Sequence, residues 1–357
     1  MQPVLSFIIP TYNMEVLLPR CLDSLVQSAY LDALEILIVN DGSTDNSLAI
    51  GKRYEEQYPT AVHVIDKSNG NYGSTINAAL PMVKGKYVKV IDSDDWVDTT
   101  ALDKLIEKLR ETDVDLVITH LVQWYKDNKK EVVRYNTMGR EPYTYGQTYL
   151  LDDVLKDKYI RFFLMPTITY RTDFLYTIEY RQTEGISYTD TEWATIPLFH
   201  VQTIVFLDLK LYQYDLDREG QTMSPAVLMR SIPQLEKVTD RLLAYYREHK
   251  LQLSSIRQAF MKQYFENRVR ILYKLYLLDM PRKDFQPETL QLLDDKLTLL
   301  SKELNLHPRL YPENKVLRID YIAFWHKYRR RWHPVLEALN HQLDLLARWI
   351  YVRCFRK

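Results

Sequence analysis

The stretch Leu34-Glu-Ile-Leu-Ile-Val-Asn-Asp-Gly-Ser-Thr-Asp45 joins an apolar run directly to a polar turn. A short, nearly continuous apolar run of this kind is typical of a strand that is covered on both faces of a parallel sheet. Asn40, Asp41 and Ser43 then stand at the carboxyl end of that strand, which is the edge where ligands bind in open α/β sheets. This order of strand and polar turn recurs through the first third of the chain.

Apolar runs alternate with amphipathic segments between residues 4 and 120. Further strands are predicted at 4–10, 62–65, 86–91 and 114–119, and helices at 15–28, 43–58, 72–83 and 99–111. Buried strands separated by amphipathic helices indicate a mostly parallel sheet with helices on both faces. The sequence therefore predicts an α/β fold of the Rossmann-like kind for this part of the chain.

The rest of the chain changes character twice. Residues 121–225 mix short strand-like runs with one predicted helix at 146–156. From about residue 226 the pattern is helical, with candidate helices at 233–249, 254–280, 287–304 and 334–352, and prolines between them. We therefore expect an α/β domain over residues 1–225, followed by a mainly α-helical C-terminal extension over residues 226–357.

The composition is that of a globular protein. Of 357 residues, 46% are hydrophobic, and 47 Lys and Arg balance 47 Asp and Glu, so no overall field draws the chain to nucleic acid. Two cysteines, Cys21 and Cys354, cannot form a disulfide framework, which is typical of a reducing compartment. We see neither a signal peptide nor an uncharged stretch near the ~20 residues of a transmembrane helix, and expect a cytoplasmic protein.

Polar clusters follow four predicted strands and would meet at one edge of the sheet. They are Pro10-Thr-Tyr-Asn13, Asn40-Asp-Gly-Ser-Thr-Asp45, Asn69-Gly-Asn-Tyr-Gly-Ser74 and Asp92-Ser-Asp-Asp-Trp96. The second and third can also be explained as a helix cap and a loop. The fourth places three carboxylates within four residues, and these repel one another in a partly buried site unless a cation is present. Such oxygen ligands suit Mg²⁺ or Mn²⁺, and a solvated acidic turn is the alternative.

Three segments together resemble the family 2 glycosyltransferases. They are Phe7-Ile-Ile-Pro-Thr-Tyr-Asn13, Ile38-Val-Asn-Asp-Gly-Ser-Thr-Asp45 and Val90-Ile-Asp-Ser-Asp-Asp-Trp96. The resemblance is strong over residues 4–120 and weaker over 160–225. It implies a GT-A catalytic domain with a nucleotide-sugar-binding half (1–120) and an acceptor half (121–225). The implied reaction is inverting transfer of a sugar from a nucleotide diphosphate sugar, with UDP expected, to a saccharide or lipid-linked acceptor in surface polysaccharide synthesis.

The resemblance also implies roles for residues at the strand ends. Tyr12, with Pro10 and Thr11 beside it, would line the nucleotide base and stack on it. Asp41 would accept a hydrogen bond from the base. Asn69 would close the base and ribose side of the pocket.

Asp92 and Asp94 match the metal-binding pair of the family. Asp94 is the expected direct ligand of Mn²⁺ or Mg²⁺, and Asp92 is expected to contact the ribose or a metal-bound water. The metal would neutralise charge on the leaving diphosphate. Asp95 is expected to hold the turn instead.

Inversion also needs a carboxylate that deprotonates the acceptor hydroxyl. In the family this base precedes an aromatic residue by three positions, which gives Asp190 as the base and Trp193 as the aromatic. Thr189 stands where the family usually has Glu, so the match is imperfect. Glu192 is the rival base, although helical spacing would point it away from Asp190.

Two further segments depart from the family pattern or match it only loosely. Ile76-Asn77 aligns with an Arg-Asn pair of the family, so a positive charge is missing that Lys67 or a later residue could supply. Downstream, Arg218 and Ser224 are candidates for contacts to the diphosphate, with a surface loop as the alternative.

The C-terminal segment is basic and aromatic. Residues 318–357 hold nine Lys or Arg and three Asp or Glu, and Tyr328-Arg-Arg-Arg-Trp332 is the densest run. One explanation is a helix docked on the catalytic domain or on a second subunit of a homo-oligomer. The other is peripheral binding at the inner face of a membrane. Nucleic-acid binding is not expected, since no recognised motif accompanies the run.

Two rival functions remain open from the sequence. A sugar-phosphate nucleotidyltransferase would have a Gly-rich, Arg-containing loop after the first strand, and Pro10-Thr-Tyr-Asn13 is not one. A catalytically inactive nucleotide-sugar-binding or scaffolding protein of the same fold is the rival from another class.

Overall fold

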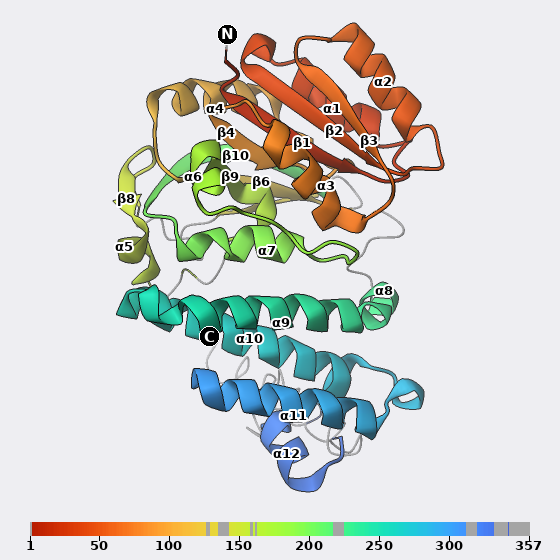
Figure 1. Ribbon diagram of the computed structural model, residues 1–357, viewed down its shortest axis with the longest axis vertical. Helices are drawn as coiled ribbons and strands as arrows, with labels where there is room; N and C mark the ends of the chain where they lie inside the picture. The colour runs from red at the N-terminus through yellow and green to blue at the C-terminus, as the bar shows by residue number, and fades with distance from the viewer. Residues whose placement is uncertain are drawn as a thin grey trace, which may run out of the picture. The chain divides into compact units, whose positions relative to one another are not determined.

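The computed structural model describes residues 2–125, 129–134, 143–157, 160, 163–216, 225–311, 320–331 and 342. The chain divides into two compact units (Figure 1). The α/β unit comprises Met1–Thr222 and Glu248–Gln258, and the helical unit comprises Met223–Arg247 and Ala259–Lys357.

A ten-stranded sheet runs through the described part of the α/β unit. Four neighbouring strands are parallel: β3 (Val62–Lys67), β2 (Leu34–Asp41), β1 (Leu5–Thr11) and β4 (Tyr87–Val90). Antiparallel β9 (Ile168–Arg171) separates β4 from β6 (Leu116–Trp124), and β6 pairs in parallel with β10 (Thr203–Asp215). Three antiparallel strands complete the sheet: β5 (Trp96–Val97), β7 (Lys130–Val133) and β8 (Thr148–Leu150). The sheet is thus parallel over β1–β4 and mixed beyond them.

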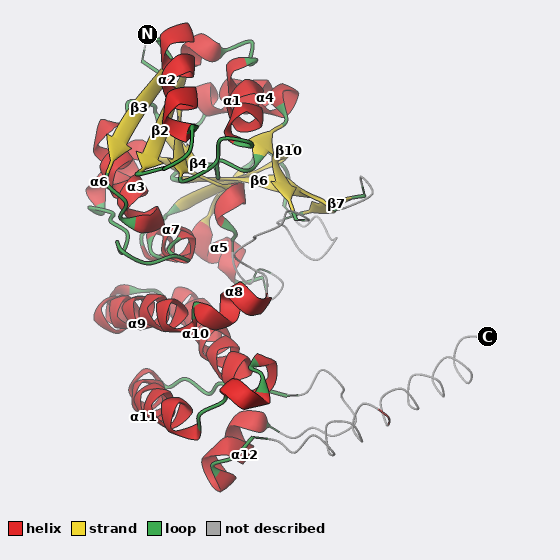
Figure 2. Cartoon of the chain, turned by 90° about the vertical axis from the view of Figure 1, so that its right-hand side faces the viewer, coloured by secondary structure: helices red, strands yellow, loops and turns green. Residues whose placement is uncertain are grey.

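Alternation along β1 places side chains on both faces of the sheet. Phe7 and Ile8 are adjacent, point to opposite faces, and are both fully buried. Helices α1 (Leu18–Val26), α2 (Ser47–Gln57) and α4 (Thr99–Glu111) cover one face, and α3 (Asn71–Ala79), α6 (Thr172–Thr177) and α7 (Asp190–Thr195) cover the other (Figure 2). This double cover is why the strands are apolar on both sides.

The helix predicted at 146–156 is wrong in its first half. Residues Thr148–Leu150 form β8, which pairs with residues 203–205 of β10, and helix α5 is confined to Leu151–Leu155. Hydrogen bonds to a strand more than fifty residues away outweigh the local helical pattern, as tertiary context commonly does. Asp152 on α5 pairs with the buried Arg257, whose guanidinium nitrogens lie 2.8 and 2.9 Å from the carboxylate.

The helical unit contains α8 (Pro225–Arg230), most of α9 (Ile232–His249) and α10 (Ser255–Lys274), α11 (Pro287–Leu304) and α12 (Tyr321–Tyr328). A buried carboxylate, Asp294 of α11, accepts hydrogen bonds from Tyr273 on α10 (2.6 Å) and His326 on α12 (2.7 Å). Arg329, which follows α12, binds the other oxygen of Asp294. In the part of the chain that is described, no helix has both the length and the apolar character to cross a membrane.

Candidate active site

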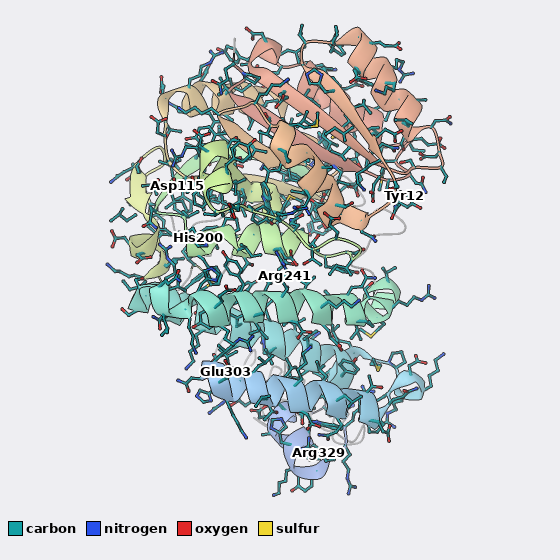
Figure 3. All side chains as sticks on the ribbon, in the orientation of Figure 1. Tyr12, Asp115, His200, Arg241, Glu303 and Arg329 are labelled. Carbon is teal, nitrogen blue, oxygen red and sulfur yellow. The ribbon has the colours of Figure 1, made fainter. Side chains whose placement is uncertain are left out.

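The turns that follow β1 and β2 are hydrogen-bonded to each other. Asn13 adopts a left-handed φ of 53°, and its Oδ1 accepts a hydrogen bond from the Thr44 N–H at 2.8 Å. The Asn13 N–H donates in turn to Ser43 Oγ at 3.1 Å. Because the two turns are joined, Tyr12 (labelled in Figure 3) stands at the same edge as Asp41. Its side chain is 47% exposed. An exposed aromatic ring at this edge can stack on a nucleotide base.

Pro10 and Thr11, predicted to line the base with Tyr12, are buried at the end of β1. The Thr11 hydroxyl donates to the Ile9 carbonyl at 3.1 Å. Their side chains therefore support the strand end, and Tyr12 is the member of this group that presents a surface to a ligand.

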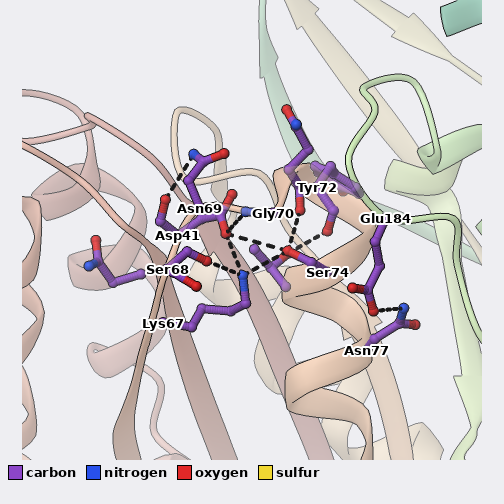
Figure 4. Close-up of polar contacts among 12 residues, drawn as sticks. Asp41, Lys67, Ser68, Asn69, Gly70, Tyr72, Ser74, Asn77 and Glu184 are labelled. Atoms are coloured by element: carbon purple, nitrogen blue, oxygen red, sulfur yellow. Dashed lines mark hydrogen bonds and ion pairs between the residues drawn. The ribbon is translucent and has the colours of Figure 1, made fainter.

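Asp41 lies in a network of donors at the end of β2 (Figure 4). Its Oδ1 accepts from Lys67 Nζ at 2.7 Å, from the Gly70 N–H at 2.9 Å and from Ser74 Oγ at 3.4 Å. Asn69 donates to the Asp41 carbonyl at 2.9 Å. Within the described residues no hydrogen bond reaches Asp41 Oδ2, so this oxygen can accept one from a ligand.

The close approach of Asn69 requires glycine at position 42. Gly42 has a φ of +70°, and a Cβ at this position would lie 2.9 Å from the Asn69 N atom. Lys67, offered above as a substitute for the missing arginine, is bound by Asp41, by the Ser68 carbonyl and by Ser74 Oγ. Its positive charge is therefore directed at Asp41.

Three carboxylates converge after β4. One oxygen from each of Asp92, Asp94 and Asp95 lies within 4.8 Å of the others. Tyr72 donates to Asp92 Oδ1 at 3.0 Å. Oxygen ligands at this spacing fit a hard divalent cation such as Mg²⁺ or Mn²⁺.

Protein donors reach both carboxylate oxygens of Asp95. Tyr212 donates to Oδ2 at 2.7 Å, and the Asp215 N–H donates to Oδ1 at 3.1 Å. Burial raises the pKa of Asp95, and the nearby charges of Asp94 and Asp92 raise it further. Asp95 thus anchors the turn to β10, and Asp92 and Asp94 are the better candidates for metal ligands.

Arg20 fixes the same turn from the side of α1. Its Nη2 donates to the Asp94 carbonyl at 2.6 Å, and its Nη1 lies 3.2 Å from Asp215 Oδ2. The guanidinium stands 4.0 Å from the centroid of the Trp96 ring, a cation–π contact. Neither Arg20 nor Tyr212 stood out in the sequence, since their partners are distant along the chain.

Asp190 is the first residue of α7 and is half-buried. Burial raises the pKa of the Tyr72 hydroxyl, and the charges of Asp92 and then Asp190 raise it further. Asp190 therefore acts electrostatically on the same hydroxyl that donates to Asp92. Tyr188, two residues before Asp190, has a φ of 66°. This conformation is sparsely populated and is often found at functional sites.

Glu192, the rival base, is fully buried and faces the protein. Its two oxygens accept from the Thr183 N–H at 2.8 Å and from the Thr183 hydroxyl at 2.7 Å. Trp193 is also fully buried, with edge-on contacts to Tyr170 and Tyr180. Because both side chains are buried, neither is placed to contact an acceptor substrate.

Some predicted residues lie outside the described residues. Arg218 and Ser224 are among them, as is all but residue 342 of the helix predicted at 334–352. Their roles stay predictions.

Residues 6–174 of the chain match the model of a family described as glycosyl transferase family 2. An uncharacterized glycosyltransferase of Mycoplasma pneumoniae, the MG025 homolog, is 42% identical over 103 residues, which are 28% of this chain and 34% of that protein. The uncharacterized glycosyltransferase YibD of Escherichia coli is 26% identical over 262 residues, 73% of this chain and 72% of that protein. The share of each relative that is matched thus varies from about a third to nearly three quarters.

The fold has a counterpart among solved structures. A crystal structure of S. aureus TarS matches with a TM-score of 0.65 and 21% identity, covering 85% of this chain and 82% of that one. The match confirms the predicted GT-A fold with its helical C-terminal region.

Proposed function

We propose that this protein is an inverting, metal-dependent glycosyltransferase that moves a sugar from a UDP-sugar to a saccharide or lipid-linked acceptor. The observation that carries the proposal is the convergence of the Asp92, Asp94 and Asp95 carboxylates after β4. They follow a strand in the same parallel row as the strand of Asp41. The charge of Asp190 acts on the Tyr72 hydroxyl, which donates to Asp92. A base pocket, a cation site and a general base are what sugar transfer from a nucleotide diphosphate requires.

On the donor side, Tyr12 would stack on the base and Asp41 Oδ2 would accept its ring N–H. An aspartate carboxylate offers hydrogen-bond acceptors only, a property that suits a base with an N–H at this position, such as uracil. Asn69 would close the ribose side. The neighbouring Asp94 and Asp92 would hold Mn²⁺ or Mg²⁺, which when bound supplies positive charge to the leaving diphosphate.

On the acceptor side, Asp190 would act as general base. Its carboxylate would take the proton of the acceptor hydroxyl while the hydroxyl oxygen bonds to the anomeric carbon. The bond from that carbon to the diphosphate breaks, and the diphosphate leaves with the electron pair. Inversion follows because the acceptor attacks from the side opposite the leaving group. The burial of Glu192 against Thr183 supports Asp190 over its rival.

The substrate class is proposed from the names of relatives. TarS of the same fold has been crystallised with UDP and with UDP-GlcNAc. A poly(ribitol-phosphate) beta-glucosyltransferase of Bacillus spizizenii is 38% identical over 120 residues, 33% of this chain and 19% of that protein. These names support a UDP-sugar donor and a cell-surface polymer as acceptor. Our proposal includes a reaction in the cytoplasm or peripherally at the inner face of the membrane.

A thermal-shift screen tests the donor site. Purified full-length protein is melted with UDP, GDP, dTDP or CDP, each with and without Mn²⁺. A ligand at about one hundred times its Kd stabilises the folded state by ~2.7 kcal/mol, which appears as a shift of a few degrees. We expect UDP to shift the melting temperature only with Mn²⁺, and Asp94→Ala to abolish the shift. No shift with any nucleotide would contradict the proposal.

The same preparation separates the enzyme from an inactive nucleotide-sugar-binding protein. Release of UDP from UDP-glucose, UDP-galactose and UDP-GlcNAc is followed with Mn²⁺ and mixed saccharide acceptors. Turnover that is lost in Asp190→Asn while the UDP shift persists supports the enzyme. Tight UDP binding without turnover of any donor favours the scaffold.

A further inference from the structure

Helix α3 contacts both halves of the proposed reaction centre. At its start, the Gly70 N–H and Ser74 Oγ donate to Asp41 (Figure 4). Tyr72 donates to Asp92. These contacts link α3 to the nucleotide side and to the carboxylate cluster. Asn77, further along α3, contacts a segment more than one hundred residues away in the chain.

Asn77, near the end of α3, holds that segment by its backbone. Asn77 Nδ2 donates to the Gln182 carbonyl at 2.9 Å, and Asn77 Oδ1 accepts the Gln182 N–H at 2.9 Å. The amide also donates to Glu184 Oε1 at 2.8 Å. A side-chain amide offers a donor and an acceptor together, so it can satisfy both backbone groups of one residue.

Close packing reinforces this link at two glycines. A Cβ on Gly73 of α3 would lie 2.0 Å from the Thr183 carbonyl, so the segment rests directly on the helix backbone. The Gly185 N–H donates to the Gly70 carbonyl at 2.8 Å. Residues 182–185 are thus fixed along the length of α3.

Two buried side chains connect residues 182 and 183 to the start of α7, where Asp190 lies. Gln182 Nε2 donates to the Thr189 carbonyl at 2.9 Å, one residue before Asp190. Glu192, fully buried on α7, accepts both hydrogen bonds from Thr183. A buried carboxylate is tolerated because its oxygens are hydrogen-bonded.

We propose that Asn77 and Glu192 are positioning residues that set the place of Asp190 relative to Asp92 and Asp94, through the segment 182–192 held on α3. The inference rests on the proposed function. In a displacement reaction the base must stand opposite the leaving group, and a misplacement of about 1 Å can cost ~10²-fold in rate. Glu192 contributes as an acceptor for Thr183 and takes no proton from the acceptor substrate.

A substitution series separates positioning from catalysis. In Glu192→Ala both bonds to Thr183 are lost, whereas in Glu192→Gln an acceptor for the Thr183 N–H remains. We expect the rate of UDP release from the donor that wild type turns over to fall about 10- to 100-fold in Glu192→Ala and Asn77→Ala. Glu192→Gln recovers most of it, and the donor KM stays within about threefold in all. Glu111→Gln and Gln57→Ala, at exposed helix positions, are matched controls.

The outcomes distinguish this inference from the proposed function. If Glu192→Gln is as inactive as Asp190→Asn, Glu192 is a base and the inference is wrong. If Asn77→Ala loses the UDP and Mn²⁺ thermal shift together with turnover, Asn77 serves the donor site instead.

Amide hydrogen exchange gives a readout without turnover. Asn77→Ala should speed exchange in residues 182–190 while the UDP and Mn²⁺ shift persists. Unchanged exchange overturns the inference even if wild type turns over no donor.

Discussion

Two short runs of like-charged residues are arranged differently in the fold: the side chains of one converge, and those of the other bind separate partners. Asp92, Asp94 and Asp95 turn toward one another, with one oxygen of each inside 4.8 Å. In the run of three arginines after α12, Arg329 binds Asp294 and Arg331 donates to the carbonyls of Leu277 and Met280. Arg330 is exposed, and no described residue hydrogen-bonds to it or pairs with it.

The difference shows what a charged run can be used for. Converging like charges are unfavourable in a partly buried site and mark a place where a cation is needed. Diverging charges each satisfy a separate carboxylate or set of carbonyls and stabilise the fold. Two of the three arginines are used in this way, which leaves Arg330 as the member of the run that no described residue binds.

The largest expected effect is in the converging run. Asp94→Ala should lower kcat/KM by about 10³-fold, because a metal that stabilises the leaving diphosphate is worth several kcal/mol of transition-state energy. Steady-state UDP release measured against Mn²⁺ concentration checks this. Asp32→Ala, an exposed carboxylate elsewhere on the α/β unit, should match wild type. An Asp94→Ala enzyme within tenfold of wild type would refute the metal role.

The next effect is on stability in the diverging run. Asp294→Ala removes the buried acceptor shared by Tyr273, His326 and Arg329. Because His326 and Arg329 are exposed and can be solvated by water, we expect a loss of about 2–4 kcal/mol. Chemical denaturation of the full chain measures the loss in the helical transition. Asp295→Ala, its exposed neighbour on α11, is the matched control and should change stability by less than ~0.5 kcal/mol. Equal effects of the two substitutions would show that the Asp294 network contributes little.

The pH dependence of the same network sharpens the comparison. Burial opposes ionisation of Asp294, but hydrogen bonds from His326, Tyr273 and Arg329 lower its pKa from 3.8 to about 2. A folded pKa below the unfolded value means that the stabilisation is complete above the unfolded pKa and is lost as the pH falls toward the folded pKa. The stability difference between wild type and Asp294→Asn should therefore shrink as the pH falls from about 5 to 3. A difference that grows over this range would contradict the assigned direction.

The smallest effects compare arginines within one run. Arg329→Ala removes a charge-assisted hydrogen bond to Asp294 and should cost about 1.5–3 kcal/mol of unfolding free energy. Arg330→Ala should stay within ~0.5 kcal/mol, as exposed substitutions usually do. Vesicles with anionic lipid test the remaining role of Arg330, since a membrane contact predicts weaker binding of Arg330→Ala at unchanged stability. Reversed stability effects would show that the two arginines have exchanged roles.

Local sequence was sufficient for much of the fold. The helix predicted at 99–111 is α4 with the same bounds, and the strands predicted at 4–10 and 34–39 are β1 and β2 to within two residues at each end. Their apolar periods lie within one element, and Asp98 caps α4 through the Ala101 N–H. The shared location of the polar turns could also be predicted, because parallel strands end at one edge of the sheet.

Tertiary structure decided the rest, because the deciding contacts join residues far apart in the chain. The sequence alone determined that carboxylates gather after a buried strand, and which motif they form. Only the fold placed Tyr72 against Asp92, turned Glu192 into the protein toward Thr183, and made residues 148–150 a strand beside β10. The sequence specifies the chemistry of each side chain. Whether that side chain contacts a ligand or a neighbouring backbone depends on which distant element packs against it.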